Sequence, residues 1–127
     1  MTDTQGLVLK ALVTEADMHD GAAGIRLLLM IAGLFPRLRL IWADGSYRGK
    51  FAEWVQRVCH WTVEITLPNA LVKGFQVLPR RWVGERTFGW FGLNRRLSKD
   101  YEYYPQTSES MIYVVMIRLM LRRLADP

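Results

Sequence analysis

Apolar and polar positions follow clear periods along the chain, and these periods predict strands and helices in alternation. Residues 7–13 form a short apolar run rich in Leu and Val, which is typical of a buried strand. Residues 22–35 place apolar side chains at helical spacing, and Pro36 ends that helix. Residues 38–42 predict a second strand, which delivers Asp44 at its C-terminal end. Strand, helix and strand within this length indicate a βαβ unit with parallel pairing.

The remaining residues continue the alternation. They predict a helix at 49–60 and a half-buried strand at 61–67. A loop at 68–79 follows, with a short strand or turn at 75–78. A helix through Glu85 ends near Gly92 and Asn94, and a last helix spans 107–124. This order favours an α/β fold with a mixed sheet flanked by helices. At 127 residues the chain has room for one domain, residues 1–127.

Composition narrows the class of protein. Half of the residues are hydrophobic, which is enough for a core, and the formal net charge is +5. Of the 17 basic residues only Lys10, Lys50, Lys73 and Lys99 are lysines, and the arginine bias suits phosphate binding. Cys59 is the one cysteine, so it forms no intramolecular disulfide and no cysteine zinc cluster, and we expect a small buried side chain in a reducing compartment.

No membrane or secretion signal is evident. The polar start lacks a basic leader, and the longest apolar stretch, residues 27–35, is far shorter than the roughly 20 residues that a membrane helix needs. We therefore expect a soluble cytoplasmic protein.

Glu85 is the first candidate for chemistry, since it lies among arginines. On a helix, Arg81 is its neighbour one turn away, and Arg86 follows it directly. One interpretation is a surface ion pair, which stabilises little. The other is a metal-binding carboxylate beside phosphate-binding guanidinium groups.

Asp44 is the second candidate, because ligands of open α/β sheets bind outside the carboxyl ends of strands. An Asp before Gly-Ser is also an ordinary turn residue. The polar cluster of residues 15–20 is explained better by helix entry, with Asp20 as a cap, than by a metal site. Near Glu85, we expect Trp82 to pack in the core, whereas Trp90 suits either the core or base stacking.

A family resemblance covers nearly the whole chain. The order Arg81, Glu85, Arg86 and Phe88, then Arg95-Arg96, residues 99–102 and residues 107–113, closely resembles the C-terminal signature of bacterial insertion-sequence transposases of the DDE type. Residues 43–49 resemble the second acidic motif of that family, and Glu85 resembles its third acid. Leu78 stands where a sister branch has a Tyr three positions before the Arg, so the match is to the branch related to insertion sequence families four and five.

The resemblance implies a ribonuclease-H-like catalytic domain in which three acids hold two Mg²⁺ or Mn²⁺ ions and DNA is cut and joined. Asp44 and Glu85 would be catalytic metal ligands. The expected phosphate-binding residues are Arg81, Arg86, Arg95 and Arg96.

One departure from the family concerns its first acid, which lies on the first strand of the family's fold. Asp3 resembles the residue that begins the second strand. We therefore expect the first strand and its Asp to be missing. Three hypotheses remain open: a partial transposase, an inactive remnant or split half that binds DNA or an upstream partner half, and a small basic nucleic-acid-binding module. An exposed sheet edge would favour self-association.

Overall fold

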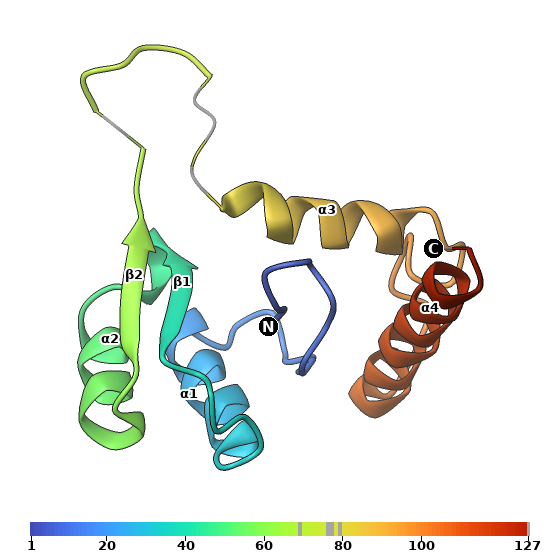
Figure 1. Ribbon diagram of the computed structural model, residues 1–127, viewed down its shortest axis with the longest axis horizontal. Coiled ribbons are helices and arrows are strands. Elements are labelled where there is room, and N and C mark those ends of the chain that lie inside the picture. Colours follow the sequence, from blue (N-terminus) through green and yellow to red (C-terminus); the bar gives the residue numbers. More distant parts are fainter. Residues whose placement is uncertain (69, 76–77, 79, 127) are drawn as a thin grey trace. The chain divides into compact units, whose positions relative to one another are not determined.

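The computed structural model describes residues 1–68, 70–75, 78 and 80–126 (Figure 1). The chain forms two compact units. The sheet unit is Glu15–Trp82, and the two-helix unit combines Met1–Thr14 with Val83–Pro127. The architecture is a mixture of helix and strand, which confirms the α/β class.

The sheet unit contains a parallel pair of strands. Its elements are α1 (Asp20–Ile31), β1 (Leu40–Asp44), the short helix η1 (Gly45–Tyr47), α2 (Lys50–Trp54), the π-helical turn η2 (Val55–Cys59) and β2 (Thr62–Thr66). β1 and β2 lie side by side in parallel, with Leu40 opposite Thr62 and Asp44 opposite Thr66. The predicted strand at 61–67 and the predicted helix at 49–60 are therefore confirmed within about one residue at each end.

Close packing in the sheet unit joins α1 to η1 and α2. A Cβ added to Gly24 of α1 would lie 2.6 Å from the Phe51 ring and 2.9 Å from the Tyr47 ring, so the missing side chain lets these rings approach. Phe51 is buried together with Leu28, Ile31 and Val55. Tyr47, in the turn that follows Asp44, packs against the buried Phe51 ring.

Helix α1 differs from its prediction at both ends. It begins at Asp20 and is capped by His19, whose Nδ1 accepts a hydrogen bond from the Gly21 N–H at 3.1 Å. The expected Asp20 cap is therefore wrong. The helix ends at Ile31, and the left-handed backbone of Gly33 (φ 80°) follows it.

The two-helix unit contains α3 (Arg81–Gly92), which begins two residues before the unit, and α4 (Pro105–Ala125). Both helices were predicted. Proline at the start of α4 suits the first turn, where its missing N–H costs nothing. Val115 and Met116 of α4 are buried, as is Thr87 of α3.

The predicted strand at 7–13 is wrong, and so is its place in the first βαβ unit. Within this segment Val8 makes one isolated antiparallel bridge to Thr2. The N–H groups of Ala11 and Val13 donate instead to the side chains of Tyr113 (3.0 Å) and Glu109 (2.9 Å) of α4. Side chains thus satisfy the backbone groups that a strand ladder would have used. The parallel pairing connects 40–44 with 62–66 rather than 7–13 with 38–42.

The short strand or turn predicted at 75–78 includes residues 76–77, which lie outside the described residues. Across the described ranges, no helix is long and apolar enough to cross a membrane.

Candidate functional site

Asp44 is the last residue of β1 and also caps η1. Its Oδ1 accepts hydrogen bonds from the Ser46 backbone N–H at 2.9 Å and from the Ser46 hydroxyl at 2.5 Å. The carboxylate is solvent-exposed. Asp44 is therefore a turn residue. The turn holds its side chain at the carboxyl end of a parallel strand, where ligands of α/β sheets bind.

Tyr47 was not identified from the sequence, although it follows Asp44 by three residues. Its ring meets Phe51 edge to face at a centroid distance of 5.0 Å. Burial raises the pKa of Tyr47, and the negative charges of Asp20 and Asp44 raise this pKa further. A phenol group is thus placed in the field of two carboxylates from α1 and β1.

A second group on the sheet was also missed from the sequence. The Trp42 indole N–H donates to Oε2 of Glu64 at 2.9 Å, across the paired strands. The Arg80 guanidinium carbon lies 3.8 Å from the centroid of a Trp42 ring. The strand period of two could have shown that Trp42 shares a face with Asp44, but Arg80 is too distant in sequence for any pattern to place it there.

Glu85 is exposed on α3, one turn after the exposed Arg81. It belongs to the two-helix unit, whereas Asp44 belongs to the sheet unit. The helix predicted through Glu85 is confirmed.

Arg86 is used inside the two-helix unit. Its Nη2 donates to the carbonyl oxygen of Gln5 at 2.6 Å, and its guanidinium carbon lies 5.1 Å from the Trp90 ring centroid. The Arg123 guanidinium also contacts this ring, at 4.8 Å. Arg86 and Trp90 both belong to α3, so the contact of Arg123 with this ring is the one that joins α3 to α4. By contrast Trp82 is 50% exposed, so its expected place in the core is wrong.

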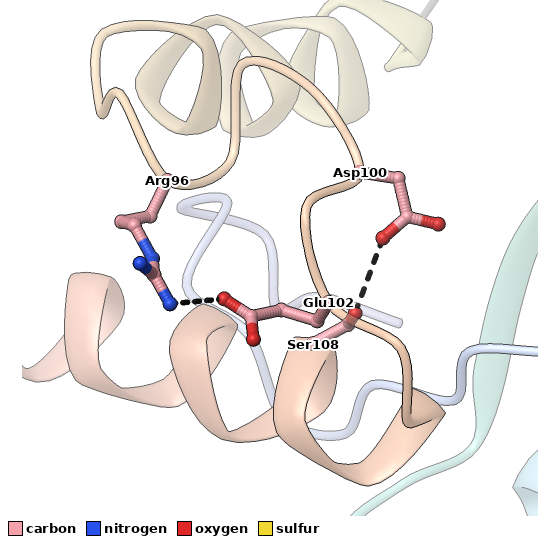
Figure 2. Close-up of polar contacts among 4 residues, drawn as sticks. All are labelled: Arg96, Asp100, Glu102 and Ser108. Carbon is pink, nitrogen blue, oxygen red and sulfur yellow. Dashed lines mark hydrogen bonds and ion pairs between the residues drawn. The ribbon is translucent and has the colours of Figure 1, made fainter.

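Arg95 and Arg96 follow α3 in a turn-rich connection, and both are exposed. Arg96 forms an ion pair with Glu102, whose side chain is only 14% exposed (Figure 2). Nearby, the Ser108 hydroxyl donates a long hydrogen bond of 3.5 Å to Asp100. These four residues help to line a cavity of about 190 Å³. Arg96 thus already has an internal anionic partner.

Comparison with known proteins decides the family. The family described as "Transposase DDE domain" matches residues 41–122, more than half of the chain. The chain belongs to this family. The match includes Asp44, Glu85 and all four candidate arginines. No curated protein and no solved structure matches the chain.

Transposases of this family act with divalent metals, and carboxylate oxygens are the ligands that Mg²⁺ and Mn²⁺ prefer. Asp44 and Glu85 therefore offer donors of the right chemistry. Within the described part of the chain, however, no group of three or more His, Cys, Asp or Glu side chains converges as a metal site. The donor type fits a metal, but the described residues of the chain do not supply a complete ligand set.

Proposed function

We propose that the chain is a C-terminal part of a ribonuclease-H-like DDE transposase domain, whose reaction is DNA cleavage and strand transfer at insertion-sequence ends. The observation that carries this proposal is the position of Asp44. It ends a parallel strand, lies within the family match, and projects from a turn whose Ser46 orients the carboxylate. Residues 1–127 would form one folding domain that includes both compact units.

The acids would act together. Asp44 and Glu85 would hold Mg²⁺ or Mn²⁺, and bound ions would supply Lewis-acid stabilisation of the phosphodiester oxygens. A third carboxylate is needed from outside this pair, because affinity for these ions follows the number and charge of ligands. An upstream segment or a partner half is the proposed source. The protein would then be partial by itself and would act in the bacterial cytoplasm, near the nucleoid.

The arginines would hold the DNA backbone. Arg81 and Arg95 are exposed, and a guanidinium group carries five N–H donors. Arg96 keeps donors besides the one used on Glu102, whereas Arg86 is half-buried and its Nη2 donates to Gln5. All four would bind phosphate in this proposal.

A second candidate function is a DNA-binding remnant or split half without catalysis. It is favoured by the described ranges, in which no group of three metal-binding side chains converges. We also propose self-association, because the sheet of the described residues has two strands, which is marginal alone, and a strand edge without a partner is a template for pairing. Size-exclusion chromatography that gives a heat-stable monomer would contradict self-association.

The test of the metal site is manganese binding measured by calorimetry. The wild-type chain is compared with an Asp44→Asn, Glu85→Gln double variant. A matched control is the Asp17→Asn, Glu53→Gln double variant, which removes the same charge from exposed positions on the loop before α1 and on α2.

Binding that is lost in the first double variant and kept in the control would support Asp44 and Glu85 as ligands. The two single variants then show whether both acids take part. Equal binding by wild type and the Asp44, Glu85 variant would contradict the metal assignment and leave the DNA-binding remnant as the better description.

A further inference from the structure

One face of the β1–β2 pair gathers polar side chains around an aromatic ring. Partners opposite each other in a parallel pair share a face, and so do residues two apart on one strand. Trp42 is opposite Glu64, and Asp44 is opposite Thr66. These side chains therefore project from the same face of the sheet. Asp44 lies about 6.6 Å beyond Trp42 along β1, from the strand rise of about 3.3 Å per residue.

Arg80 adds a cation over this face. Its guanidinium carbon lies 3.8 Å from the centroid of a Trp42 ring, which is stacking distance. Stacking uses the flat face of the guanidinium group and leaves its N–H donors, which point outward in the plane, available for an anion. Arg80 is exposed, and its side chain donates no hydrogen bond to another residue in the described ranges.

Glu64 fixes the ring on which Arg80 stacks. Glu64 accepts the Trp42 indole N–H at 2.9 Å, which fixes the orientation of the ring on which Arg80 rests. A cation held in this way loses less side-chain freedom on binding than a long side chain that is free in solvent. Trp42 and Glu64 thus act as positioning residues for the guanidinium group.

The acidic side chains of this face mean that a phosphate can bind there only beside a cation. Asp44 and Glu64 are both acidic, so the face without Arg80 would repel a phosphate. We propose that Arg80, stacked on Trp42, binds a backbone phosphate of DNA on the sheet face that carries Asp44. This site rests on the proposed DNA-binding function, and it adds a residue outside the arginines of the family signature.

The experiment measures binding of a fluorescent DNA duplex by anisotropy over a series of KCl concentrations. Arg80→Gln is expected to weaken binding on the order of tenfold and to reduce the slope of log K against log salt by about 0.9, the value for one duplex phosphate contact. Arg57→Gln is the matched control. Arg57 is exposed on η2, which precedes β2 and so lies toward the opposite end of the strands from Asp44.

Two further variants separate position from charge. Arg80→Lys keeps the charge but loses the planar fork, so its affinity is expected between those of wild type and Arg80→Gln. Trp42→Leu is expected to weaken binding in the wild type and to have little further effect in the Arg80→Gln background. Full additivity of the two changes would contradict positioning by Trp42.

The outcomes distinguish this site from the proposed function. DNA binding with the same salt slope in wild type and Arg80→Gln would overturn the Arg80 site and leave DNA binding intact. No DNA binding by the wild-type chain would overturn both, while the manganese measurement still tests the acids. Inhibition by inorganic phosphate, beyond that of chloride at equal ionic strength and lost in Arg80→Gln, would assign the site to free phosphate instead of DNA.

Discussion

The Thr87 hydroxyl donates a 2.7 Å hydrogen bond to the carbonyl oxygen of Gly6, a residue 81 positions earlier. Thr87 is only 3% exposed. Together with the bond from Arg86 to Gln5, this contact holds the N-terminal segment on α3, the helix that carries Glu85. The N-terminal segment therefore has a defined structural role although it forms no strand.

Substitution of Gly6 by Ala tests this attachment. Gly6 has a left-handed backbone (φ 82°), and an added Cβ would lie 2.8 Å from the Thr87 hydroxyl oxygen and 3.3 Å from the Trp90 ring. Backbone strain costs about 1 kcal/mol and overpacking costs a further 1–3 kcal/mol, so we expect a loss of roughly 2–4 kcal/mol in the free energy of unfolding. Urea unfolding followed by circular dichroism measures this loss.

Gly33→Ala is the control for that experiment. Gly33 has nearly the same backbone (φ 80°), but nothing lies within 4 Å of an added Cβ. Its substitution should cost the strain alone, about 1 kcal/mol. Equal losses in the two variants would show that the contact with Thr87 does not restrict the site.

The raised pKa of Tyr47 predicts that the free energy of unfolding falls at alkaline pH. Its pKa is raised in the folded chain, mainly by burial and then by Asp20 and Asp44. The folded state therefore holds this proton more tightly than the unfolded state does. The resulting stability is fully present below the ordinary tyrosine pKa of about 10 and is lost as pH rises through the raised value.

Absorbance titration of tyrosinate measures the raised pKa, and Tyr47→Phe should remove the component that carries it. Asp20→Asn should lower the pKa of Tyr47 more than Asp44→Asn does, because the Asp20 charge contributes more to the shift. A Tyr47 titration that neither substitution moves would contradict the effect of the two carboxylates on the phenol.

The Arg96–Glu102 ion pair predicts competition between an internal carboxylate and DNA phosphate. Glu102→Gln should raise DNA affinity a few-fold, because it releases a guanidinium group for phosphate, whereas Arg96→Gln should lower it. Stability should change by less than about 1 kcal/mol, since the Arg96 side chain is 61% exposed and solvent screens the pair. Anisotropy and urea unfolding measure the two effects.

Glu53→Gln makes the same change of net charge on α2 and serves as the control. If it raises DNA affinity as much as Glu102→Gln does, the gain comes from overall charge and not from the release of Arg96.

The linear pattern was enough to predict the local elements with strong periods, although not both ends of α1. The period of two at 61–67 and the helical spacing at 49–60 and 107–124 correspond to observed elements. Asp44 was correctly placed at the carboxyl end of a strand. The motifs at 43–49 and 81–86 also indicated the transposase family, whose match includes both. These features depend on neighbours within a few residues, which a linear pattern records.

Contacts between groups far apart in the sequence could not be predicted from the pattern. Residues 7–13 have the composition of a strand, but Tyr113 and Glu109 of α4 take two of their backbone N–H groups. The Trp42 indole donates a hydrogen bond to Glu64, 22 residues away, and the Arg80 guanidinium group stacks on the Trp42 ring. The physical reason is that a buried or half-buried polar group must find a partner in space, and the position of that partner depends on how the elements pack.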